Sequence, residues 1–357
     1  MKLLITGICG FVGSQIARGI RLAQPDVQIW GIDNFSRPGS RLNENPLRSL
    51  GIKFVEGDIR YPADLARIPQ VDWVIDSAAN PSVLAGLEGS TSSFDLLDHN
   101  LIGTIRLLEF CKQHRAGFLL LSTSRVYSIN PLAALNVDPV ANAFVPTGNA
   151  INGFGPQGIR EDFSTEPPLS LYGTSKRASE FLALEYGSAF GFPVRINRCG
   201  VMAGPGQFGK ADQGIFSYWI HSWTSQRKLK YIGFGGMGYQ VRDCLHPKDL
   251  VPLLLRQIQK PDHDAPPIIN VSGGLRSATS LAQLSSWCAS RFGTREVDAD
   301  QSPRPFDLPW VVLDSSLAEK FWGWKPDTPV ERILDEISEH ALSNPDWLEI
   351  TGGPVMK

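Results

Sequence analysis

The stretch Lys2-Leu3-Leu4-Ile5-Thr6-Gly7-Ile8-Cys9-Gly10-Phe11-Val12-Gly13 decides the fold. Its apolar residues 2–6 predict a short buried strand, and three glycines spaced three apart predict a tight loop. Apolar residues then recur at helical spacing over 12–23, and a second strand, 27–33, ends in Asp33. A strand, a glycine loop, a helix and a second strand closed by an acid form a unit that binds dinucleotides. The pyrophosphate then lies at the helix N-terminus and the acid contacts the adenosine ribose.

Strands and helices continue to alternate beyond this unit. This alternation predicts an α/β fold, a Rossmann-type doubly wound parallel sheet with a smaller C-terminal substrate-binding α/β domain. In such sheets ligands bind beyond the carboxyl ends of the strands, where Asp33, Asn80 and Thr123 lie. For Asp58 the sequence leaves two interpretations open, a contact to adenine or a turn aspartate. We expect further strands over 53–60, 71–79, 117–121, 194–199, 230–234 and 268–271, and helices around Asn100, from Tyr172 onward, and over 213–223, 248–259 and 280–293.

The composition excludes several classes of protein. The 357 residues carry a net charge of −2, which argues against nucleic acid or an anionic membrane as the main partner. No apolar run reaches about eighteen residues, so we expect no transmembrane helix, and the first apolar run is too short for an export signal. Neither the five cysteines nor the six histidines show a metal-binding spacing, so we expect no metal. Scattered cysteines fit reduced thiols in a cytoplasmic protein.

Tyr172 and Lys176 are four residues apart, so on a helix both side chains leave the same face. An ammonium beside a phenol favours the phenolate, which can act as a general base. Taken alone, this spacing is more often an ordinary surface pair. The glycine loop, Asp33 and Thr123 favour the catalytic interpretation.

The whole pattern resembles the extended short-chain dehydrogenase/reductase superfamily, and within it the NAD-dependent nucleotide-sugar epimerases and dehydratases. Two later stretches, GPGQFGKADQG (204–214) and GMGYQVRDCLHPKDL (236–250), are similar to the CDP-paratose 2-epimerase subfamily. The residues that match the superfamily pattern in order are Gly7, Gly10, Gly13, Asp33, Asp58, Asn100, Thr123, Tyr172 and Lys176.

The resemblance implies roles for individual residues. Thr123, Tyr172 and Lys176 would be catalytic, and Lys176 would also reach the nicotinamide ribose. Arg242 would pair with the substrate diphosphate, the alternative being a surface salt bridge to Asp243. The other expected substrate contacts are Ser124, Arg125, Gln207, Gln213 and Arg304. The expected cofactor contacts are Gly7, Gly10, Phe11, Val12, Gly13, Asp33, Asn34, Asp58, Ile59, Ala79, Asn100, Tyr172 and Lys176.

The cofactor is expected to be NAD, because the carboxylate of Asp33 would repel the 2′-phosphate of NADP. Arg37 weakens this argument, since a guanidinium could receive that phosphate. We place an NAD-binding Rossmann domain with the catalytic residues at 1–190. Residues 191–357 would be mainly a substrate-binding domain, with segments near 230–260 returning to the first.

Three features depart from the superfamily pattern. Ser124 and Arg125 stand where 4,6-dehydratases carry an Asp-Glu pair that eliminates water, so dehydration is disfavoured. Ala203 replaces a common Tyr. The segment 128–169 is a long insert, which we expect to lie above the sugar pocket.

The implied function is NAD-dependent epimerisation of a nucleotide-diphosphate sugar through a transient keto-sugar. CDP-paratose/CDP-tyvelose-type 2-epimerisation is the first expectation. The alternatives are a UDP-sugar 4-epimerase, a keto-sugar reductase and, from another class, a non-catalytic NAD-binding sensor. Relatives commonly form homodimers through two long helices, here the Asn100 and Tyr172 helices. The sequence leaves open the sugar, the nucleotide base, the inverted carbon, the oligomeric state and the role of the insert.

Overall fold

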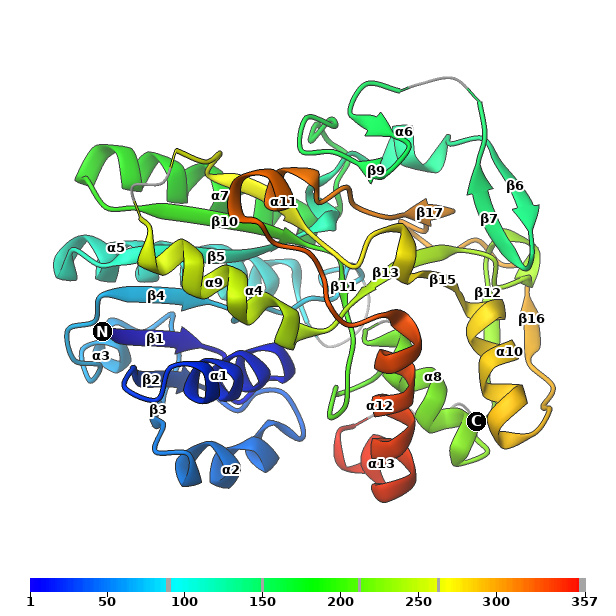
Figure 1. Cartoon of the computed structure of the whole chain (residues 1–357), viewed down its shortest axis with the longest axis horizontal. Coiled ribbons are helices and arrows are strands. Elements are labelled where there is room, and N and C mark those ends of the chain that lie inside the picture. Colours follow the sequence, from blue (N-terminus) through cyan, green and yellow to red (C-terminus); the bar gives the residue numbers. More distant parts are fainter. Residues whose placement is uncertain (88–90, 149–150, 211–212, 262–263, 353–357) are drawn as a thin grey trace.

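A seven-stranded sheet forms the centre of the molecule, with strand order β14-β10-β5-β4-β1-β2-β3 and every neighbouring pair parallel (Figure 1). The computed structural model describes residues 1–87, 91–148, 151–210, 213–261 and 264–352. The expected Rossmann-type doubly wound sheet is thus confirmed. In sheet order the strands are Ile268–Val271, Val194–Cys199, Gly117–Thr123, Trp73–Asp76, Lys2–Thr6, Gln28–Asp33 and Lys53–Glu56.

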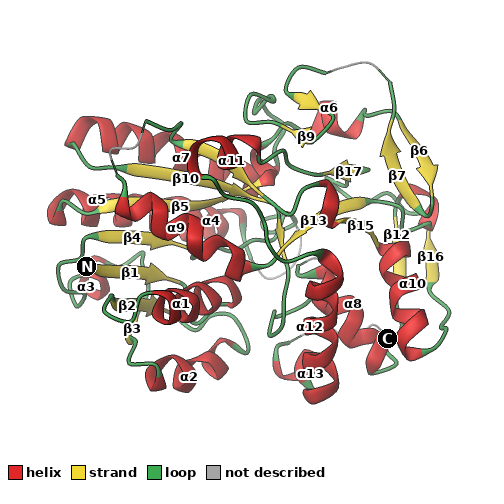
Figure 2. Ribbon diagram, in the orientation of Figure 1, coloured by secondary structure: helices red, strands yellow, loops and turns green. Residues whose placement is uncertain are grey.

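Both faces of this sheet are buried, which explains its nearly continuous apolar strands. Leu3 and Ile5 pack with one set of helices, whereas Leu4, between them, packs with the other set. Figure 2 shows the strands as a layer between helices. The first face is covered by α1 (Phe11–Ala23), α2 (Glu44–Ser49), α9 (Leu250–Gln259) and α11 (Ser316–Trp322), and the second by α3 (Pro62–Leu65), α5 (Gly103–His114) and α7 (Ser170–Phe190).

A smaller α/β unit lies beyond the carboxyl ends of these strands (Figure 1). Its core combines Trp219 and Trp223 with Leu284, Ile333 and Ile337. Its strands are β11 (Val201–Met202), β13 (Val241–Leu245), β15 (Ala278–Ser280) and β17 (Trp310–Val311) in one sheet, and β12 (Lys230–Ile232) with β16 (Asp298–Asp300) in another. Its helices are α8 (Ile215–Thr224), α10 (Leu281–Phe292), α12 (Val330–Ser343) and α13 (Trp347–Ile350).

The 128–169 insert packs against this smaller unit. The amide of Phe144 donates to the carbonyl of Tyr239 at 2.9 Å, and the amide of Ile159 donates to the carbonyl of Val312 at 2.9 Å. Residues 149–150 of the insert lie outside the described residues. The insert contains α6 (Ile129–Ala133), the hairpin of β6 (Val137–Val140) and β7 (Ala143–Pro146), and the hairpin of β8 (Phe154–Gly155) and β9 (Gly158–Ile159).

The expected elements agree with the structure except at their ends. The expected strands 53–60 and 71–79 shorten to β3 and β4, because residues 57–59 and 77–79 leave the sheet to line a cavity. The division at residue 190 stays a prediction. The central sheet takes β10 and β14 from beyond that residue, and of the 230–260 range Leu245 and α9 belong to the core around α1. Among the described residues, no helix combines the length and apolar character needed to cross a membrane.

Candidate active site

The glycine loop connects β1 to α1 and ends directly at the helix N-terminus. Gly7 has a φ of +58°, and its carbonyl accepts a 2.9 Å hydrogen bond from the amide of Gly10. A Cβ on Gly13 would lie 2.3 Å from the Gly7 oxygen, so only glycine permits this close packing. The loop therefore leaves space beside the N-terminus of α1, where a pyrophosphate can bind.

Asp33, at the end of β2, is held by two backbone amides. Its carboxylate oxygens accept from Cys9 and from Phe35, each at 2.8 Å. Burial raises the pKa of Asp33, and these two amides oppose that shift by stabilising the carboxylate. The carboxylate is thereby fixed at the edge of the loop, where an adenosine ribose is expected.

Asp58 is fixed by neighbouring side chains. Arg60 donates to it at 2.8 Å and Asn34 at 2.9 Å. Burial works against the charged form, but these hydrogen bonds outweigh it and lower the pKa of Asp58 to about 2. Both open interpretations of Asp58 keep some support, since it lines the cavity and also caps the turn to Arg60.

A cavity of about 1300 Å³ runs from the glycine loop to the smaller unit. This exceeds the roughly 300–1,000 Å³ of a site for one small ligand, so it has room for a cofactor and a substrate together. Every residue expected to bind ligand lines it except Asn100. Asn100 is buried behind the wall, where its side chain bonds both backbone groups of Asn80 and the hydroxyl of Ser175.

Thr123, Tyr172 and Lys176 meet at the edge of this cavity. Thr123 ends β5, and its hydroxyl lies beside that of Tyr172 in the first turn of α7. Burial raises the pKa of Tyr172 to about 12, while Thr123 and the charge of Arg125 act to lower it. Lys176 follows one turn later and is 2% exposed. Burial lowers its pKa, and the carboxylates of Asp76 and Glu180 counteract this shift.

Gly173 lets α7 approach the end of β5. A Cβ at this position would lie 2.3 Å from the carbonyl oxygen of Arg125. The turn before it is tied by Ser170, which has a φ of +71° and accepts from the Gly173 amide at 3.2 Å. Gly173 was not among the expected site residues, although a glycine directly after the candidate tyrosine is typical of close backbone contact.

Arg125, Arg242 and Arg304 also line the cavity, together with Asp307. Arg242 pairs with Asp307 at 3.3 Å, and not with Asp243 as the alternative interpretation had it. Asp243 is fully buried and accepts from the amide of Leu313 at 2.9 Å. Asp307 was not among the expected site residues.

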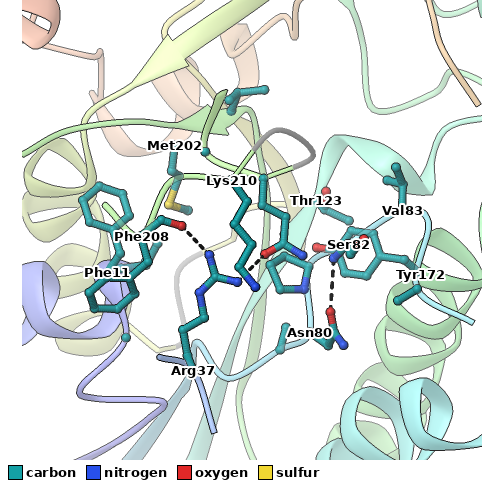
Figure 3. Close-up of a pocket in the computed structure, with 18 of the residues that line it drawn as sticks. Phe11, Arg37, Asn80, Ser82, Val83, Thr123, Tyr172, Met202, Phe208 and Lys210 are labelled. Atoms are coloured by element: carbon teal, nitrogen blue, oxygen red, sulfur yellow. Dashed lines mark hydrogen bonds between the residues drawn. The ribbon is translucent and has the colours of Figure 1, made fainter. Parts of the chain in front are cut away.

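Arg37 bridges the mouth of the cavity (Figure 3). It donates to the Gln213 side chain at 3.0 Å and to the carbonyl of Phe208. Phe208 stacks on Trp347, whose indole donates to the carbonyl of Gln207 at 2.9 Å. Gln207 in turn donates to the carbonyl of Met202 at 2.8 Å. Residues 211–212 of the 204–214 stretch lie outside the described residues.

Comparisons with known proteins agree on one family. The model for the "NAD dependent epimerase/dehydratase family" matches residues 3–272. CDP-paratose 2-epimerase of Salmonella typhi is 32% identical over 298 residues, covering 80% of this chain and 82% of the relative. UDP-glucuronate 4-epimerase of Thermodesulfobacterium geofontis is 26% identical over 353 residues, covering 96% of each chain.

Solved structures support the fold. The UDP-glucuronic acid 4-epimerase of Bacillus cereus, determined with UDP-glucuronic acid and NAD, superposes with a TM-score of 0.75 at 23% identity. The match covers 96% of this chain and 99% of that one. At this identity the likeness shows the fold alone.

Proposed function

Because this chain belongs to the NAD-dependent epimerase/dehydratase family, whose members act on nucleotide sugars, we propose that it inverts one carbon of the sugar in a nucleotide-diphosphate sugar. One observation carries the proposal. Thr123 and Tyr172 lie side by side, with Lys176 one turn away, on the wall of the same cavity that the glycine loop opens into.

The cofactor is NAD, and the residues present fit it. Gly7, Gly10 and Gly13 leave room for the pyrophosphate, and Asp33 would accept from the adenosine ribose. Arg37, which could have received a 2′-phosphate, is held by Gln213 and Phe208. When bound, NAD accepts a hydride from the sugar and returns it.

Tyr172 supplies the base in the proposed reaction. Its phenolate takes the proton of a ring hydroxyl, and Thr123 holds the same oxygen by a hydrogen bond. The charge of Arg125 favours the phenolate, and Lys176 would reach the nicotinamide ribose. The resulting keto-sugar turns within the cavity, and Tyr172 returns the proton once the opposite face has been reduced.

The residues beside Thr123 favour epimerisation over dehydration. Elimination of water needs an acid and a base on the sugar, and Ser124 and Arg125 provide neither carboxylate. Ser124 and Arg125 both line the cavity, at the positions where a catalytic acid and base for elimination would have to lie.

Two carbons of the sugar are candidates for inversion. Inversion at C2 of a CDP-sugar follows from the relative at 32% identity, and inversion at C4 of a UDP-sugar follows from the UDP-glucuronate epimerase that covers 96% of the chain. The experiment is proton NMR of CDP- and UDP-sugars incubated with the purified protein and no added coenzyme. Appearance of the 2- or 4-epimer identifies the carbon. If product forms only as added NADH is consumed, the protein is a reductase and the proposal fails.

We also infer a cytoplasmic homodimer that pairs α5 and α7. Phe181 on α7 is 54% exposed, as expected of an apolar side chain that a second copy would cover. The described cysteines are free and buried, which fits a reducing compartment. Light scattering measures the mass, and the Phe181→Glu variant should have the mass of a monomer. A monomeric native protein would refute the pairing.

A further inference from the structure

Arg125 lies at the reacting end of the cavity. It follows Thr123 by two residues, and its amide donates to the Thr123 hydroxyl at 3.2 Å. Its carbonyl is the group against which Gly173 packs, directly after Tyr172. The side chain lines the cavity and donates to the carbonyl of Phe306 at 3.3 Å.

No carboxylate neutralises this guanidinium. Among the described parts of the chain, none lies within 4 Å of the Arg125 nitrogens, although Asp307 acts on it from further away. Burial lowers the pKa of Arg125 to about 10, and the nearby Arg242 adds to this lowering. Arg125 is partly buried, and a cation withdrawn from water is destabilised unless an anion accompanies it. A neutral carbonyl occupies only part of its five N–H groups. An anion on the bound ligand would remove this cost.

The diphosphate is one such anion, but the other two arginines are better placed for it. Arg242 is bonded to Asp307, and Arg304 lies on the same short segment as Asp307. Of these three arginines, only Arg125 contributes to the change in the Tyr172 pKa. Its amide bonds Thr123 and its carbonyl packs against Gly173, so Arg125 lies beside the catalytic pair, where the substrate would present its sugar.

We propose that Arg125 binds a carboxylate carried by the reacting sugar, so that the substrate is a nucleotide-activated acidic sugar such as a uronic acid. A guanidinium binds a carboxylate through two parallel hydrogen bonds, which no single sugar hydroxyl can replace. The inference rests on the proposed function of the same site. It concerns the charge of the sugar and holds for either base and either inverted carbon.

The test is calorimetric titration of the NAD-loaded protein with UDP-glucuronic acid, UDP-glucose and UDP. Comparing sugars on one base cancels any preference for that base. Wild type should bind UDP-glucuronic acid about tenfold or more tighter than UDP-glucose, as expected for a hydrogen-bonded charge pair. Arg125→Gln should abolish that ratio and leave the affinity for UDP unchanged, which also shows that the variant is folded. Arg304→Gln should weaken all three ligands by a similar factor.

Two results would overturn the inference. One is equal affinity of wild type for the two sugars, with both bound more tightly than UDP. The other is a loss of UDP affinity in Arg125→Gln as large as in Arg304→Gln, which would assign Arg125 to the diphosphate. If wild type binds none of these compounds and none of their CDP counterparts, the proposed function fails together with the inference.

Discussion

The Nη1 atom of Arg37 donates a 3.0 Å hydrogen bond to Oε1 of Gln213, 176 residues later in the chain. The same guanidinium donates to the carbonyl of Phe208, so the loop after β2 is tied to the segment before α8. Ser36, Arg37, Phe208 and Gln213 all line the cavity on the adenosine side. This bridge holds together two segments that line the cavity.

Replacing Arg37 by Ala should therefore weaken cofactor retention. Loss of hydrogen bonds from a charged group is expected to lower NAD affinity by roughly tenfold. The measurement is NAD content per chain after gel filtration, followed by titration of the apoprotein with NAD. Arg41→Ala is the matched control, because Arg41 is exposed and pairs with Glu56 outside the cavity. Equal NAD content in both variants would contradict the bridge.

Tyr172→Phe should abolish turnover and preserve the fold. It removes only the phenol oxygen, so the packing of α7 is kept while the proposed base is lost. The expected decrease in kcat is roughly 10²- to 10⁴-fold. Tyr186→Phe provides a control on the same helix, since its hydroxyl bonds Glu109 away from the cavity. The readouts are epimer formation by NMR and thermal unfolding by circular dichroism. Comparable turnover by the two variants would rule out Tyr172 as the base.

Thr123→Val should move the pH dependence of catalysis upward. The Thr123 hydroxyl lowers the pKa of Tyr172 against the upward effect of burial. Removing the hydroxyl raises this pKa further, so less phenolate is present at pH 7. The rising limb of kcat/KM against pH should move to higher pH. At pH 7, kcat/KM should fall about tenfold for each pH unit by which that limb moves. A lower kcat/KM with an unmoved pH profile would mean that Thr123 acts on the substrate alone.

Local pattern was sufficient to predict the first half of the fold. The glycine loop, α1 and Asp33 lie within 32 residues, so turn chemistry and periodicity define them without distant contacts. The carboxyl ends of parallel strands share one edge of a sheet, which brought Asp33 and Thr123 to the same cavity.

Features that depend on distant contacts were not predictable in the same way. The insert was expected above the sugar pocket, yet none of its described residues lines the cavity. The carbonyl of Ile159 accepts from Asp314 at 2.8 Å, and such long-range backbone pairs leave no periodic signal in the sequence. For the same reason, the hydrogen bond between Arg37 and Gln213 could not be predicted from the sequence.

Beneath the catalytic helix, Glu180 is fully buried and pairs with Arg198 of β10 at 2.8 Å. Glu180 also accepts from Ser122 at 2.6 Å, and Arg198 donates to the hydroxyl of Tyr127 at 3.2 Å. This pair joins α7 to β5 and to the segment entering the insert. No local pattern indicated the pair, because the two residues lie on different elements.

Arg198→Met should therefore destabilise the protein strongly. The substitution leaves the Glu180 carboxylate buried without its closest counter-charge, with Arg177 remaining on its other side at 2.9 Å. The expected loss is about 3–5 kcal/mol in the free energy of unfolding, measured by urea denaturation of the NAD-free protein. Arg160→Met serves as the control, since its ion pair with Asp162 has a similar length of 2.9 Å but both side chains are exposed. That variant should change stability by less than about 1 kcal/mol. If both substitutions lowered the free energy of unfolding by the same small amount, the Glu180–Arg198 pair would contribute little to the packing of α7 on the sheet.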